Sequence, residues 1–147
     1  MLRWLVMTNG VRKALLAILF LGLIGTEVEL FLLKHTDGFW QLVPVILVAL
    51  TILLAAWAGI APSRASLATL RVVMAALLVS GIIGIVQHFT GNVGYERESN
   101  PGLGGMELYG AAAMGSTPLL APGVMLQLGL VGLLYTLRHP ALTQTNS

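Results

Sequence analysis

The sequence contains no cysteine, which excludes disulfide bonds, thiol catalysis, iron–sulfur clusters and cysteine-ligated zinc. Charge is also scarce, because only 10% of the residues are Asp, Glu, Lys or Arg, whereas a soluble domain has about 25%. A chain with so few charged side chains cannot cover its surface in water. The polar–apolar alternation of membrane β-strands is missing, and so are phosphate-loop, zinc-protease and dinucleotide-binding motifs. These absences favour an α-helical membrane protein and give no support for nucleic-acid binding or catalysis.

Four apolar segments are present, each near the roughly 20 residues that cross about 30 Å of hydrocarbon as a helix. They are residues 14–34, 39–60, 67–89 and 119–137. The sequence therefore predicts an all-α fold, an integral membrane four-helix bundle within residues 14–137. A stub of residues 1–13 precedes the bundle, residues 90–118 form a long loop, and residues 138–147 form a tail.

The charged residues predict the orientation of the four segments. With an even number of spans, six of the eight cations share one side of the membrane: Arg3, Arg12, Lys13, Arg64, Arg71 and Arg138. All six acidic residues lie toward the other side. The positive-inside rule then places both termini in the cytoplasm. Arg64 and Arg71, two helical turns apart, are expected to contact anionic lipid headgroups from one face.

The loop of residues 90–118 is expected on the outer side. Its first half is polar and rich in turn-forming residues. Its second half has apolar residues at helical spacing, which predicts a short helix on the outer leaflet: Leu103, Met106, Tyr109, Gly110, Ala113 and Met114. Glu96 and Glu98 make this loop acidic, and an acidic loop suits a basic partner.

Glu27 and Glu29 lie in the outer half of the first span, where a carboxylate costs roughly 2.5–3.5 kcal/mol on insertion scales. They point about 200° apart on a helix because they are two residues apart. Glu29 continues a stripe of small residues, Gly22, Gly25 and Thr26. Glu27 continues a bulky stripe, Phe20, Leu23 and Phe31. Since membrane helices pack closely through small residues, we expect Glu29 to point into the bundle and Glu27 to point toward a partner protein.

His88 lies near the outer end of the third span, on a stripe with Gly81 and Gly84. If the first and third helices pack together, Glu29 and His88 are expected within hydrogen-bond reach, directly or through one water. Such a pair is either a structural hydrogen bond or a proton relay. Two ligands do not make a metal site. The sequence requires no cofactor, and His88 is its candidate ligand for heme or chlorophyll magnesium.

The stretch His88-Phe89-Thr90-Gly91-Asn92, followed by Glu96, Glu98 and Pro101, resembles a group of uncharacterised small bacterial four-span inner-membrane proteins. The resemblance covers most of the chain, although Gly94 stands where a glutamate is expected. It implies a bacterial inner membrane and no activity.

Three function classes remain open. The first is an accessory or structural subunit of a larger membrane complex, respiratory or photosynthetic, that acts through contacts with other subunits. The second is a small proton-linked transporter that uses Glu29 and His88. The third is a membrane enzyme acting on a lipid or quinone, with His88, Glu96 and Glu98 near the outer surface. Small size and little catalytic equipment favour the first class.

Overall fold

The computed structural model describes residues 8–143, and within that range the chain is helical with short connections and no β-strand. The all-α prediction is therefore confirmed. The helices are α1 (Asn9–Leu32), α2 (Phe39–Ile60), α3 (Arg64–Ser99), α4 (Gly105–Ala113), α5 (Gly123–Thr136) and α6 (Pro140–Thr143). Among them α1, α2 and α3 are long and apolar enough to cross a membrane.

The fourth apolar segment forms a shorter helix than the sequence predicts. At its start, residues 118–122 form turns, and the amides of Ala121, Gly123, Val124 and Met125 bond to the carbonyls three residues earlier. Two prolines lie in this stretch, and proline has no N–H with which to continue a helical ladder. As a result α5 has 14 residues, about 21 Å of helix at 1.5 Å per residue.

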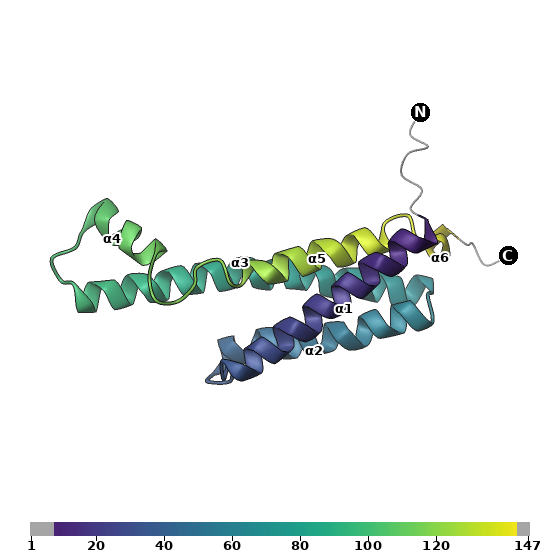
Figure 1. Ribbon diagram of the computed structural model, residues 1–147, viewed down its shortest axis with the longest axis horizontal. Helices are drawn as coiled ribbons and strands as arrows, with labels where there is room; N and C mark the ends of the chain where they lie inside the picture. Colours follow the sequence, from purple (N-terminus) through teal and green to yellow (C-terminus); the bar gives the residue numbers. More distant parts are fainter. Residues whose placement is uncertain (1–7, 144–147) are drawn as a thin grey trace, which may run out of the picture.

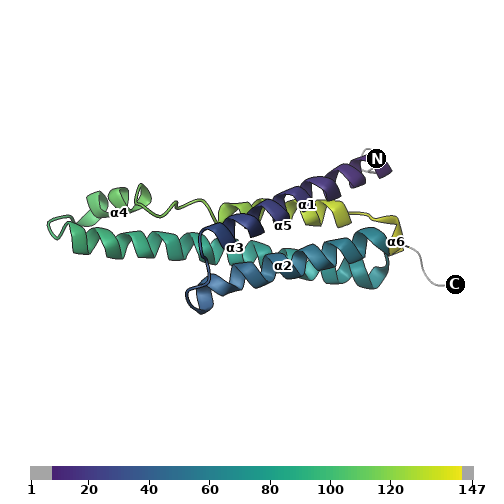
Figure 2. The same cartoon turned by 60° about the horizontal axis from the view of Figure 1, so that its bottom comes forward.

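The four apolar helices form a closed ring in the order α1, α2, α3, α5. Each helix packs along its two neighbours, and in the described part of the chain the backbones of the diagonal pairs α1–α3 and α2–α5 do not approach each other, although side chains reach across the ring. Figure 1 shows α3 along the whole length of the molecule, with the start of α1 and the short α6 near its first residues. Figure 2 shows from another side that α5 lies alongside α3 and that α1 runs beside α2.

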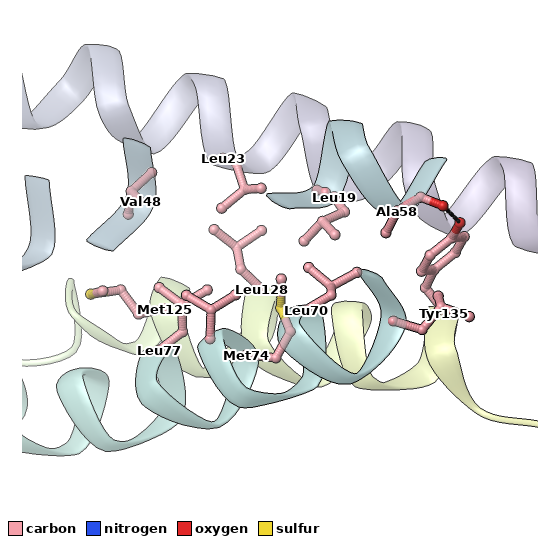
Figure 3. Packing of buried hydrophobic residues seen from close by; sticks show 13 residues of the cluster. Leu19, Leu23, Val48, Ala58, Leu70, Met74, Leu77, Met125, Leu128 and Tyr135 are labelled. Atoms are coloured by element: carbon pink, nitrogen blue, oxygen red, sulfur yellow. Dashed lines mark hydrogen bonds between the residues drawn. The ribbon is translucent and has the colours of Figure 1, made fainter. Parts of the chain in front are cut away.

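The centre of the ring is filled by apolar side chains from four helices, mostly leucine and methionine, with valine and alanine from α2 (Figure 3). Five of these side chains are at most 5% exposed: Leu19 and Leu23 of α1, Leu70 and Met74 of α3, and Leu128 of α5. In lipid this interior is stabilised by van der Waals packing, because the surrounding acyl chains are as apolar as leucine.

Glycines bring α3 and α5 close together. A Cβ added at Gly129 would lie 2.9 Å from the backbone oxygen of Met74, and one at Gly84 would lie 2.7 Å from Pro122. Gly81 and Gly132 also lack room for a side chain, against Pro122 and Met74. The stripe of Gly81, Gly84 and His88 is therefore a helix-packing face, and the helix that it faces is α5.

Two helices begin earlier than predicted. The turn before α3 is capped by Ser63, whose hydroxyl accepts from the amide of Ser66, and the helix starts at Arg64. Thr8 caps α1 by accepting from the amide of Val11 at 3.4 Å. Residues 9–13 of the expected stub are therefore helical, while residues 1–7 and 144–147 lie outside the described range.

The structure corrects the prediction for the long loop. Helix α3 continues through the polar segment after Thr90 as far as Ser99, which makes it 36 residues long. At 1.5 Å per residue this is about 54 Å, well beyond the roughly 30 Å of hydrocarbon. The end of α3 thus projects past α1, α2 and α5, and α4 lies beside it (Figure 1).

Helix α4 exists where the sequence predicts it, but it packs on protein. Leu108 is 4% exposed and Ala112 is fully buried, and α4 makes its helix contacts with α3. The rings of Phe89 and Tyr109 lie 6.1 Å apart across this pair. The expected interfacial helix is therefore one arm of a helical hairpin, the α3–α4 hairpin.

Candidate functional site

The two glutamates of α1 point the opposite way from the prediction. Glu29 is exposed, whereas Glu27 is half-buried and its Oε2 is buried without a hydrogen-bond partner among the described residues. The bulky stripe faces inward as well, since Leu23 is fully buried and Phe20 packs against the core. Phe31, one turn beyond Glu27, is 59% exposed and remains outside.

The reason for the reversal lies in the ring arrangement. Small residues mark places where two helices approach closely, and Gly22 does meet Leu128 of α5. The centre of a four-helix ring is wider and takes the leucine side of α1 instead. Gly25 and Glu29 lie just outside the α1–α5 contact, where a Cβ added to Gly25 would meet nothing within 4 Å.

The structure does not form the predicted Glu29–His88 pair directly. The pair depends on packing of α1 against α3, and these helices lie diagonally across the ring. His88 instead contacts the carbonyl oxygen of Pro118 through Nδ1, at 2.8 Å. His35 of the α1–α2 turn has a pKa lowered mainly by burial and further by its proximity to His88. His88 thus contacts the backbone of the segment that leads into α5.

The α3–α4 hairpin is held by a residue that the sequence analysis missed. Asn92 is 1% exposed, and its amide nitrogen donates to the carbonyls of Ala112 at 3.0 Å and Thr117 at 2.8 Å. Its oxygen accepts from the amide of Thr117 at 3.2 Å. Gly115 packs directly on this side chain, where a Cβ would lie 2.6 Å from Asn92. Its place in a polar, turn-rich segment gave no sign of burial, so the sequence alone could not single it out.

The hairpin presents acidic side chains at its free end. Glu98 and Glu107 are exposed, and Glu96 is half-buried and accepts a hydrogen bond from Asn100 at 2.9 Å. Arg97 is the cation of this segment. The projecting tip is therefore an acidic surface separated from the apolar bundle.

At the opposite end a buried arginine joins α1 to the end of α5. Arg12 is 6% exposed and donates to the carbonyl oxygens of Tyr135, Leu137 and Arg138, at 2.7, 3.0 and 2.8 Å. These carbonyls belong to the last turn of α5 and its exit, where helix carbonyls have no helical partner and the macrodipole is negative. Tyr135 also donates to the carbonyl of Ala58 in α2 (Figure 3).

A second arginine, Arg71, also forms hydrogen bonds with the end of α5. Arg71 donates from Nε to the Thr136 hydroxyl at 3.0 Å and from Nη2 to the Thr136 carbonyl at 2.9 Å. Arg64 is exposed, whereas Arg71 is half-buried and caps α5. Contact of the two arginines with lipid headgroups stays a prediction.

The described residues contain no cluster of three or more His, Asp or Glu side chains placed to hold a metal ion. His88, the candidate cofactor ligand, is engaged with Pro118 through one of its two ring nitrogens. Function has to be inferred from the chain's own residues, since the chain matches no protein-family model, no curated protein and no solved structure.

Proposed function

We propose that this protein is an accessory subunit of a larger membrane complex and acts by binding other subunits through helix contacts. The observation that carries the proposal is the exposed Glu29 beside the open Gly25 on the outer surface of α1. Leu21 and Leu32, which are 76% and 77% exposed, complete this surface, the α1 outer face. A carboxylate on such a face is compensated when a neighbouring helix supplies a hydrogen-bond donor.

The α1 outer face has room for a second helix. In the most apolar 18 residues of α1, only 17% of the residues are buried by the rest of the chain, whereas the corresponding share is 28% in both α2 and α3. Gly25 would let the backbone of a partner helix approach closely. We therefore infer a partner transmembrane helix that carries Arg, Lys, Ser or Thr opposite Glu29, in place of the Glu27 contact expected from the sequence.

The acidic tip of the α3–α4 hairpin supports the same proposal. It extends beyond the bundle and carries Glu98 and Glu107 in exposed positions. Such a tip favours a partner with a basic surface on that side of the membrane, because complementary charges steer association. Together with the α1 outer face it would give the subunit one contact within the membrane and one outside it.

The proposal includes four spans with both termini in the cytoplasm of a bacterial inner membrane. It is supported by α5, which lies along α3 and whose exit meets the start of α1 through Arg12. The end of the bundle that holds Arg12, Arg64 and Arg71 carries no acidic residue. Under the positive-inside rule this is the cytoplasmic end, and α5 together with the 118–122 turns forms the fourth, short crossing.

Single cysteines test this topology, because the native chain has no thiol. Ser99→Cys at the hairpin and Ala65→Cys at the start of α3 both lie at exposed positions. A membrane-impermeant maleimide added to intact cells is expected to label Ser99→Cys and to label Ala65→Cys only after the membrane is permeabilised. The opposite pattern would reverse the orientation. Labelling of both variants from outside would show that α3, which has one of these positions at each end, does not cross the membrane.

The contact function is tested by Glu29→Leu. Purification in a gentle detergent, followed by mass spectrometry, is expected to recover the wild-type chain with other membrane subunits in fixed stoichiometry. Glu29→Leu is expected to lower this recovery about tenfold, the equivalent of roughly 1.4 kcal/mol for one lost hydrogen bond to a charged group. Its helical circular dichroism and thermal midpoint are expected to stay unchanged, since Glu29 is exposed.

Val79→Leu is the matched control, because Val79 is an apolar residue of α3 that is 56% exposed. This variant is expected to retain the partners. Recovery of the wild-type chain alone, as a monodisperse monomer, would refute the contact function.

One observation favours the transporter alternative, and it concerns Glu27. Its buried Oε2 has no partner among the described residues, as a proton-carrying carboxyl would require. The inner half of the ring argues against transport, because the fully buried Leu19, Leu70 and Met74 offer no polar path there. Proton-coupled transport by the purified monomer that is abolished in Glu27→Gln would establish this alternative.

A further inference from the structure

A cavity of about 150 Å³ opens at the cationic end of the bundle, beside the arginine cap of α5. Its polar wall is formed by Asn9, Arg12, Lys13 and His139, and Leu16 and Pro62 contribute to its apolar wall. The volume equals about five waters at roughly 30 Å³ each. It therefore has space for a group of the size of a phosphate.

Arg12 places a positive charge in this wall that no acidic side chain neutralises. All six Asp and Glu residues belong to the outer half of α1, the α1–α2 turn or the α3–α4 hairpin. The two Nη atoms are bound by carbonyl oxygens, but Nε is buried and has no partner among the described residues. A buried cation without a counter-charge is costly, and an anion bound in the cavity would compensate it.

The neighbouring side chains add donors. Lys13 and Asn9 are exposed at the rim and can turn toward a bound anion. Nδ1 of His139 accepts from the amide of Ala141 at 3.2 Å, so we assign the proton of the neutral ring to Nε2. Burial lowers the pKa of His139, and the nearby Arg12 lowers it further, which keeps the ring neutral at pH 7. The cavity thus offers charge from Arg12 and Lys13 and neutral donors from His139 and Asn9.

The rest of the wall is apolar and lies between α1 and the end of α2. Leu16 packs tightly on Gly59, where a Cβ would lie 2.8 Å from the leucine side chain. Pro62 closes the cavity on the side of the α2–α3 turn. An amphiphile could therefore place its polar group against the cations and its first carbons along this wall.

We propose that this cavity is a binding site for the phosphate group of an anionic ligand, held by Arg12 and Lys13 with Asn9 and His139 as further donors. Basic pockets between membrane helices suit the headgroups of anionic phospholipids, and inorganic phosphate offers the same chemistry. Binding would neutralise the arginine that joins α1 to α5 and so stabilise the inner end of the ring. The site is independent of the proposed subunit contacts, which lie at the outer half of the molecule.

Native mass spectrometry of the full chain in detergent tests the site. The probes are phosphatidylglycerol, phosphatidylcholine with the same acyl chains, and inorganic phosphate. The Lys13→Gln variant is expected to bind phosphatidylglycerol about fivefold more weakly, which corresponds to the roughly 1 kcal/mol contributed by a basic residue near anionic lipid. Arg64→Gln is the matched control, because it removes an exposed cation of the same end that does not line the cavity.

Saturable binding of phosphatidylglycerol in preference to phosphatidylcholine, weakened by Lys13→Gln and unchanged in Arg64→Gln, would establish a lipid headgroup site. Displacement of that lipid by inorganic phosphate, with the same dependence on the variants, would establish a free-phosphate site. Equal binding of the two lipids with no binding of phosphate would overturn the proposal. An equal loss in both variants would also overturn it, since the effect would then be one of overall charge.

Discussion

Arg12→Met is expected to lower the free energy of unfolding by about 3 kcal/mol, the largest effect of any single substitution that we foresee. Methionine preserves much of the length of the side chain but cannot donate a hydrogen bond. The carbonyls of Tyr135, Leu137 and Arg138 would lose their charged donor at the end of α5. The positive charge that opposes the α5 macrodipole would be lost as well.

The measurement is a titration of the purified protein in mixed micelles with sodium dodecyl sulfate, followed by circular dichroism. Arg64→Met is the control, because it removes an exposed arginine at the same end of the bundle. We expect the control to change the free energy by no more than about 0.5 kcal/mol. Equal midpoints for the two variants would show that the arginine cap does not stabilise the fold.

Gly129→Ala is expected to be the second most damaging change, with a loss of about 2 kcal/mol. The new methyl group would lie 2.9 Å from the backbone oxygen of Met74 and 2.9 Å from the side chain of Leu78. The leucine could rotate away, but the carbonyl belongs to α3 and can move only with that helix. The most extensive helix interface of the protein, between α3 and α5, would have to open.

Gly25→Ala supplies the matched comparison, since it makes the same chemical change in a helix where nothing lies within 4 Å. Alanine is favoured over glycine in a helix by up to about 1 kcal/mol, so the isolated chain should be unchanged or slightly stabilised. The same titration measures both variants. Destabilisation by Gly25→Ala comparable to that of Gly129→Ala would contradict the described packing and restore Gly25 to the bundle interior.

Hydropathy and composition were sufficient to predict the apolar helices, though not the extension of α3 to Ser99 or the shortness of α5, for a reason specific to membranes. Backbone groups in hydrocarbon have to be bonded within their own segment, so long apolar runs have little choice but to be helical. The stripe of Gly81 and Gly84 does lie at a close helix contact, but with α5 and the turn before it and not with α1.

The orientation of α1 could not be predicted in the same way. Gly22, Gly25 and Glu29 were taken as the inner face from residue size alone. Inner and outer sides depend on how many helices meet and how wide the space between them is. In a ring of four, Leu19 and Leu23 fill that space, and Glu29 is left outside.

By itself the sequence determined an all-α protein whose apolar helices suit a membrane, because these properties follow from composition and local backbone chemistry. Only the tertiary structure decided which residues meet across the chain. Arg12 reaches carbonyls more than 120 residues away, and Asn92 binds Thr117 across the α3–α4 hairpin. Such contacts join positions with no local sequence relation, so they arise from the arrangement of whole helices and from their unsatisfied backbone ends.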